Sequence, residues 1–226
     1  DYLQNADQTT PMQWFSKTGL PWWTNLSFHD HPPLFFIIQY LFTSIFGDTL
    51  FAVRLPSVLA GLLSIWFLYL ITRKVFNKMN VLHAEYAGLL AAALLAVNHI
   101  HIWISRSSLM ESTLIAVILL NIYLFFNFIQ DCKKYWTYFG LTLGLVFLTK
   151  YTAAFLLPAY FIFLLIYHRD IFKEKWLYFS AILSSIIFSP VLVYNYNLYK
   201  IVGHFDLQFA YLLKQAHADK VSICIA

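Results

Sequence analysis

The chain has 226 residues, of which 60% are hydrophobic and 12% are charged, and its formal net charge is +4. A water-soluble domain is about half apolar and about a quarter charged, so this chain has too little polar surface to cover a globule in water. The composition therefore excludes an ordinary soluble domain and predicts an integral, multi-pass membrane protein, with membrane lipids as neighbours. We expect no nucleic-acid partner.

Residues 1–54 are predicted to form a large first loop outside the membrane. Within this loop, the stretch LFFIIQYLFTSIF at residues 34–46 would be roughly 20 Å long as a helix, which is short of a ~30 Å hydrocarbon core. We therefore expect an interfacial or re-entrant helix that Gly47 and Asp48 end. The chain opens on Asp1 without a methionine or a signal peptide, so we expect a fragment that lacks upstream and downstream parts.

Residues 55–194 are predicted to form a bundle of about six transmembrane helices. The apolar runs are too long for strands, and backbone that faces lipid must form its hydrogen bonds within its own segment, which favours helices over a barrel. The predicted spans are residues 55–72, 84–103, 107–128, 136–149, 151–168 and 176–194. Residues 195–226 are predicted to be an outer loop or tail. The expected fold class is thus an all-α, polytopic transmembrane bundle with interfacial helices in its first loop.

Basic residues follow every second predicted span. They gather in three connections, residues 73–83, 129–135 and 169–175. Lysine and arginine collect on the cytoplasmic side of membrane proteins, so these connections are predicted to be cytoplasmic. The remaining connections, which contain Arg106 and Lys150, are then predicted to face outward.

Ionisable residues at or near membrane depth mark candidate functional sites, because they are costly in lipid unless they are paired or hydrated. Four places qualify, and the predicted topology brings all of them to the outer side. They are Asp1, the group His29, Asp30 and His31, the pair Arg106 and Glu111, and Lys150. Glu111 lies about one turn inside its span, and either Arg106 or a water-filled cavity could compensate its charge.

The ordered motifs of residues 29–160 resemble the family 39-type membrane glycosyltransferases, the protein O-mannosyltransferase and aminoarabinose-transferase relatives of the GT-C class. His31 to Leu34, then Phe46 and Gly47, then Arg54 to Ser57 match the pattern hPPL, FG and RLPS of that family. Arg106 with Glu111 five residues later, and the LTK motif that ends at Lys150, match two further elements. Each motif alone is weak, but the ordered set at these separations is fairly specific.

This resemblance implies a reaction and its site. Such enzymes transfer a sugar from a polyprenyl-phosphate carrier to an acceptor protein, lipid or glycan on the outer side, here predicted to be that of the cell membrane. An acid acts as the general base, and the implied catalytic residues are Asp1, Asp30 and Glu111. The leaving lipid phosphate needs positive charge nearby. The implied substrate-binding residues are His31, Arg54, Arg106 and Lys150.

The chain departs from the family pattern in its first loop. Relatives carry a pair of acids a few residues before a tyrosine, whereas this chain begins at Asp1 and Tyr2, so Asp1 is either the base or its neighbour. Relatives also carry an acid followed by lysine before the proline, where this chain has Asp30 followed by His31. A histidine contacts phosphate less dependably than a lysine does.

Structural explanations compete with these functional ones. Asp30 could cap the following helix, Arg106 and Glu111 could form a structural ion pair, and Lys150 could extend from a helix end toward water. No cofactor is required, although His29, Asp30 and His31, or the histidines at 29, 31, 99 and 101, could hold a divalent metal such as Zn²⁺.

Two other classes of function also fit a polytopic protein. A transporter or lipid flippase without transferase activity would carry polar residues to mid-bilayer, and a scaffold would leave its outer polar residues dispersed. The span centres here are nearly uncharged, which favours the transferase.

Overall fold

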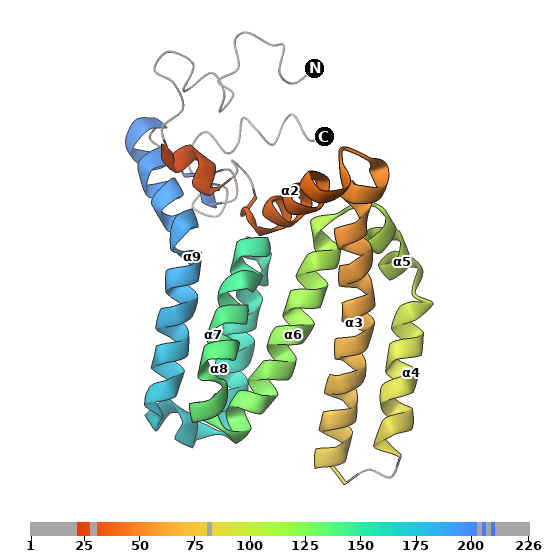
Figure 1. Ribbon diagram of the computed structural model, residues 1–226. Helices are drawn as coiled ribbons and strands as arrows, with labels where there is room; N and C mark the ends of the chain where they lie inside the picture. Colours follow the sequence, from red (N-terminus) through yellow and green to blue (C-terminus); the bar gives the residue numbers. More distant parts are fainter. Residues whose placement is uncertain (1–21, 28–30, 81–82, 203–204, 207–208, 211–226) are drawn as a thin grey trace. The chain divides into compact units, whose positions relative to one another are not determined.

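The computed structural model describes residues 22–27, 31–80, 83–202, 205–206 and 209–210, and all regular structure within them is helical (Figure 1). This confirms the predicted all-α class. In chain order the elements are η1 (Trp22–Leu26), α2 (Leu34–Phe46), α3 (Leu50–Lys78), α4 (Ala84–Ala96), α5 (His99–Arg106), α6 (Met110–Gln130), α7 (Cys132–Thr149), η2 (Tyr151–Phe155), α8 (Leu156–Tyr167), η3 (Arg169–Lys173) and α9 (Lys175–Val202).

The chain divides into two compact units. Unit 1 comprises residues 1–32 and 189–226, and unit 2 comprises residues 33–188. In unit 1, the rings of Trp23 and Tyr194 meet edge to face with centroids 5.6 Å apart, and the Asn195 side chain is hydrogen-bonded to Asp206. Unit 2 contains the helices from α2 to the first half of α9.

Among the residues that the structure describes, three helices are long and apolar enough to cross a membrane, namely α3, α6 and α9 as far as Lys200. A fourth candidate covers the predicted span 84–103, which the structure divides into α4 and α5, two helices bent by 61° at a short break. The break has a local cause. The Asn98 side chain caps α5 by accepting a hydrogen bond from the His101 N–H at 3.0 Å, which starts a new helix there.

One helix has the predicted bounds, whereas two others extend beyond their predicted spans. The helix predicted over 34–46 forms with those bounds, and Gly47 ends it with a φ of 77°, a left-handed conformation that favours glycine. By contrast α3 starts at Leu50, because the Thr49 side chain caps it by accepting a hydrogen bond from the Ala52 N–H. The helix then continues through Pro56. The last helix also extends to Val202, beyond the predicted span.

Small residues let α7 and α9 pack closely within unit 2. A Cβ atom added at Gly140 would lie 2.6 Å from the Ser180 carbonyl oxygen, and one at Gly144 would lie 2.7 Å from Ile187 Cβ. A buried polar group joins α6 to α7 and α8. Asn121 donates to Thr142 Oγ1 at 2.9 Å and accepts from the Tyr160 hydroxyl at 2.7 Å. These contacts hold the helices together in lipid, where the hydrophobic effect contributes little to the association of helices.

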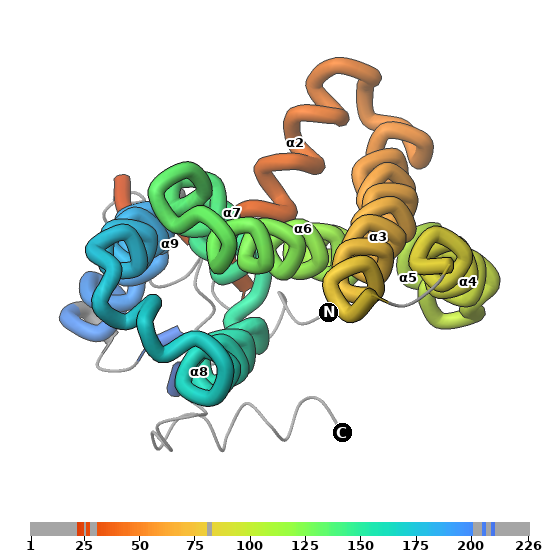
Figure 2. Tube along the Cα trace, turned by 90° about the horizontal axis from the view of Figure 1, so that it is seen from below, coloured from red at the N-terminus to blue at the C-terminus, as the bar shows by residue number. Residues whose placement is uncertain are grey.

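The helices of unit 2 run antiparallel between two ends, seen from the side in Figure 1 and end-on in Figure 2. The charged residues of these helices divide between the two ends. At one end, called the basic end, α3 and α6 finish and α4, α7 and α9 begin. The basic residues there are Arg73, Lys74, Lys78, Lys133, Lys134, Arg169, Lys173 and Lys175. The opposite end carries the start of α6 and the end of α7, and α2 lies across the start of α3 there (Figure 1).

Candidate active site

An ion pair joins two helices at the end of unit 2 opposite the basic end. Lys150 Nζ lies 2.7 Å from Glu111 Oε1, within hydrogen-bond distance. The two side chains are 21% and 37% exposed, so the pair is accessible from outside the helix bundle. The sequence left the partner of Glu111 open between Arg106 and a cavity, and the structure shows that Lys150, 39 residues away, compensates the carboxylate.

Both charges stand where the helix backbone favours them. Glu111 lies in the first turn of α6, near the positive end of the helix dipole. Lys150 is the C-cap residue of α7, near the negative end, and its extended backbone directs the chain into η2. Since α6 and α7 are antiparallel neighbours, these two ends come together (Figure 1).

Serine hydroxyls tie the start of α6 to α3. Ser112, the residue after Glu111, is fully buried and donates to the Ser57 carbonyl at 2.6 Å. In return the Ser57 hydroxyl donates to the Leu109 carbonyl at 3.3 Å. The first turn of α6 is therefore held rigidly against α3, which fixes the backbone that carries Glu111.

The turn before α6 is fixed in the same manner. Ser108 adopts a φ of 54°, which is uncommon for a residue other than glycine. Its hydroxyl donates to the Val53 carbonyl at 2.7 Å and accepts from Gln39 of α2 at 2.8 Å. The α2 helix is thus hydrogen-bonded to the segment that leads to Glu111.

None of these polar residues was predicted as part of the site. Gln39, Ser57, Ser108 and Ser112 support the acid without carrying charge, and their partners lie far away in the chain. In the sequence, the serines near Arg106 in the motif SRSSLMES were the signal that could have indicated this polar support of Glu111.

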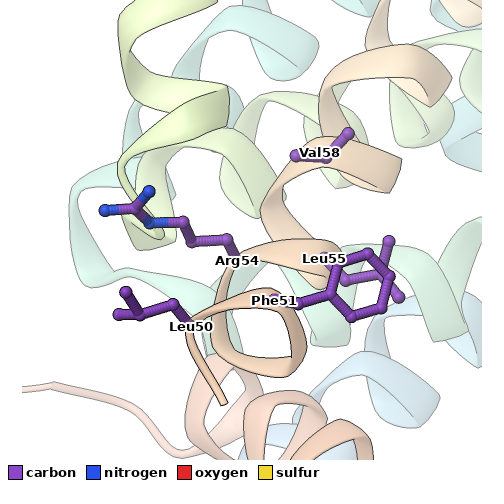
Figure 3. Close-up of a pocket in the computed structure, with 5 residues that line it drawn as sticks. All are labelled: Leu50, Phe51, Arg54, Leu55 and Val58. Atoms are coloured by element: carbon purple, nitrogen blue, oxygen red, sulfur yellow. The ribbon is translucent and has the colours of Figure 1, made fainter. Parts of the chain in front are cut away.

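Arg54 lies on the second turn of α3, at the end of unit 2 opposite the basic end. It is exposed and lines a shallow hollow of about 260 Å³ with four apolar residues of the same helix, Leu50, Phe51, Leu55 and Val58 (Figure 3). In Figure 3 the guanidinium extends to the side away from the Phe51 ring. Within the part of the chain that the structure describes, Arg54 forms no ion pair.

Arg106 is the last residue of α5 and is exposed. It forms no ion pair with the residues described, so the structure does not join it to Glu111 as the sequence suggested it could. Its charge nevertheless stands at the same end of unit 2 as the Glu111–Lys150 pair, because only the turn before α6 separates α5 from that helix.

Of the first-loop candidates, His31 lies within the described residues. His31 is half-buried and belongs to unit 1, where its carbonyl oxygen accepts from the Ser27 hydroxyl at 3.5 Å. Asp1, His29 and Asp30 lie outside the described residues, and their predicted roles stay predictions. The N-cap residue of α2 is Pro33, which has no side chain that could accept a hydrogen bond.

The alternative of a metal site finds no support in the residues described, where no group of three metal-ligating side chains comes together. His101 is buried, and its Nε2 lies 3.2 Å from the Gly61 carbonyl oxygen. This contact between α5 and α3 is a structural role for that ring.

Comparison with known proteins connects this chain to a family. Residues 30–194 match the family model described as dolichyl-phosphate-mannose-protein mannosyltransferase. The chain is 31% identical over 172 residues to "Putative mannosyltransferase YycA" of Bacillus subtilis (strain 168), covering 75% of this chain and 23% of that protein. It is 30% identical over 148 residues to "Putative mannosyltransferase YkcB" of the same organism, covering 65% of this chain and 20% of that protein.

The chain thus spans 20% to 23% of the length of these two relatives. The matched part contains Glu111, Lys150, Arg54 and Arg106. No solved structure matches the chain.

Proposed function

The chain belongs to the dolichyl-phosphate-mannose-protein mannosyltransferase family, and on this premise we propose that it is part of a membrane enzyme that transfers a mannosyl unit from a polyprenyl-phosphate carrier to an acceptor. The acceptor hydroxyl attacks the anomeric carbon, the bond from that carbon to the phosphate oxygen breaks, and the lipid phosphate leaves with the bonding electrons. A carboxylate takes the proton of the acceptor.

The observation that carries this proposal is the Glu111–Lys150 pair. An ammonium group has three N–H donors, and Glu111 Oε1 accepts one of them, so the others can bind phosphate oxygens. We propose that Lys150 binds the phosphate of the carrier and stabilises the negative charge of the leaving group. Glu111 is then a positioning residue that holds the Lys150 side chain in place.

The general base is proposed to come from the first loop, from Asp30 or Asp1. This assignment extends the family resemblance and leaves Glu111 free to orient Lys150. His31, Arg54 and Arg106 are proposed to add positive charge for the lipid phosphate. The acceptor is an alcohol on a protein, lipid or glycan.

The charge distribution supports an outward-facing site. The basic end of unit 2 is proposed to face the cytoplasm, because lysine and arginine collect there. The Glu111–Lys150 pair, at the other end, would then face the outside of the cell membrane. A polyprenyl-phosphate sugar lies in the membrane, and its phosphate would be available to Lys150 at the surface of that leaflet.

The test measures the transfer of labelled mannose from a polyprenyl-phosphate carrier in membranes that contain the full-length protein. Lys150→Ala is expected to lower transfer by about 100-fold, because the leaving group loses its stabilising cation. Lys150→Arg should retain part of the activity. Lys173→Gln, which removes an exposed charge at the basic end, is the matched control and should transfer at the wild-type rate. Wild-type transfer by a well-expressed Lys150→Ala protein would refute the proposed site.

The role of Glu111 needs a separate measurement. If it positions Lys150, which contacts the phosphate both in the bound donor and in the transition state, Glu111→Gln should raise the KM for the lipid donor and lower kcat as well. If Glu111 is itself the base, the same change should lower kcat at saturating donor and leave the KM nearly unchanged.

A further inference from the structure

Two tryptophans of neighbouring helices stack at the basic end of unit 2. Trp136 of α7 and Trp176 of α9 have ring centroids 5.9 Å apart and planes inclined by 28°. Phe179 completes the group, with its ring 5.9 Å from that of Trp136 and 5.7 Å from that of Trp176. We refer to these three residues as the aromatic cluster. Both tryptophans are half-buried, so their rings pack against the bundle and remain partly accessible.

The hydrogen-bonding groups of this cluster have no protein partner in the described residues. Neither indole N–H donates to an acceptor there, although a tryptophan N–H is a donor that normally finds one. An indole that lies at a membrane surface meets this requirement with lipid headgroups or water.

Two lysines are close to the cluster in sequence, Lys134 two residues before Trp136 and Lys175 directly before Trp176, and neither forms an ion pair within the described part of the chain. Lys134 and Lys175 are exposed, and their Nζ atoms lie 5.1 Å and 5.2 Å from the ring centroids of Tyr135 and Trp176. Three carboxylates lie nearby, those of Asp131, Asp170 and the exposed Glu174, and none of them forms an ion pair with Lys134 or Lys175 among the described residues. Asp131 accepts the backbone N–H of Lys134, and Asp170 lies 3.5 Å from Lys173. The Lys175 ammonium group lies beside an indole ring, and Lys134 adds a second positive charge at the start of α7, which together favour an anionic ligand.

An apolar surface leads from the cluster along α9. Tyr178, Phe179, Ile182 and Ile186 lie on one face of the helix and are 56%, 43%, 55% and 62% exposed. From Lys175 to Ile186 the helix rises by about 16 Å, which suits much of one acyl chain. The lysines therefore lie where the headgroup of a lipid would be, and the apolar face of α9 lies where its acyl chain would be.

From these observations we infer that the aromatic cluster, with Lys134 and Lys175, is a binding site for an anionic phospholipid of the surrounding bilayer. The lysine ammonium groups and the indole N–H groups would hold the headgroup phosphate, and one acyl chain would lie along the exposed face of α9. This site is separate from the Glu111–Lys150 pair, which stands at the other end of unit 2, and the inference does not depend on the proposed function.

Lipid binding to the purified full-length protein tests the inference, with dioleoyl phosphatidylglycerol as the anionic probe and dioleoyl phosphatidylcholine as the zwitterionic one. The double variant Lys134→Gln with Lys175→Gln should weaken phosphatidylglycerol binding by about tenfold, because each basic residue near a lipid surface contributes modestly. Phosphatidylcholine should bind less tightly than phosphatidylglycerol to the wild type and should be little affected.

A charge-matched control separates a defined site from general attraction to positive charge. Lys78→Gln with Lys200→Gln removes the same charge from exposed positions that lack a tryptophan pair, and it should bind phosphatidylglycerol like the wild type. Trp136→Phe keeps an aromatic ring and removes one N–H, so it should weaken binding by a smaller factor. Equal losses in the two double variants, or equal binding of the two lipids by the wild type, would overturn the inference.

Discussion

Glu111 and Lys150 meet at 2.7 Å although 39 residues separate them, because the first turn of α6 and the C-cap of α7 lie at the same end of two antiparallel helices. In the sequence, the acid lies within one apolar run and the lysine lies between two later apolar runs. The ion pair brings these two motifs together. It is the feature from which the predicted behaviour of the site follows.

The first prediction concerns the strength of this ion pair. Because both side chains are partly exposed, their direct coupling should be about 1 kcal/mol or less. A double-mutant cycle of Glu111→Gln and Lys150→Met, followed by unfolding in detergent, measures this quantity. Additive losses in the two single variants would mean that the residues contribute no coupling to stability, whatever their role in activity.

The second prediction concerns the buried polar group that joins α6, α7 and α8. Tyr160→Phe removes the hydroxyl that donates to Asn121 Oδ1, and the amide oxygen of a fully buried side chain then lacks that donor. Stability should fall by about 1 kcal/mol, as for other hydrogen bonds between membrane helices. Tyr167→Phe, at a residue that is 68% exposed, is the matched control and should unfold like the wild type.

The third prediction concerns the close contact of α7 with α9. Gly140→Ala places a methyl group 2.6 Å from the Ser180 carbonyl oxygen, so the helices must separate. We expect a loss of about 1–3 kcal/mol, the usual range for overpacking. Thermal unfolding provides the measurement. Thr137→Ala, at an exposed site of the same helix, should have little effect, and equal stability of both variants would contradict the close packing.

The fourth prediction concerns membrane orientation. In a protein that carries Cys132→Ser and Cys224→Ser, a cysteine introduced at Lys78 should be protected from an impermeant maleimide added outside intact cells. A cysteine introduced at Arg106 should be labelled under the same conditions, because the basic end is expected to face the cytoplasm. Cell lysis should expose both sites. Labelling of both in intact cells, or of Lys78→Cys alone, would reverse or remove the proposed outward-facing site.

The sequence predicted the helical class and the bounds of α2 correctly because both depend on local quantities. The α2 helix forms over the residues expected, since its apolar run is bounded by Pro33 and Gly47. The division of 84–103 into two helices was missed, although Asn98 is a favourable N-cap residue. A continuous run of apolar residues outweighed that single signal in the prediction.

The partner of Glu111 was less accessible to sequence reasoning. Arg106 lies five residues from Glu111 and was a natural candidate, but the turn at Ser108 gives α5 and α6 separate axes. Which cation reaches the carboxylate then depends on how α6 and α7 pack, and on contacts such as Asn121 with Thr142. Hydropathy contains no information about such lateral contacts.

By itself, the sequence determined that this protein is a set of membrane helices, because burial in lipid forbids unpaired backbone. It also determined that basic residues gather at one end and that the few other ionisable residues lie near helix ends, because lipid disfavours charge. The tertiary structure alone decided that Glu111 is paired with Lys150, which serines support that pair, and that Trp136 and Trp176 stack. These depend on the rotation and lateral packing of helices, which small residues and buried hydrogen bonds fix in three dimensions.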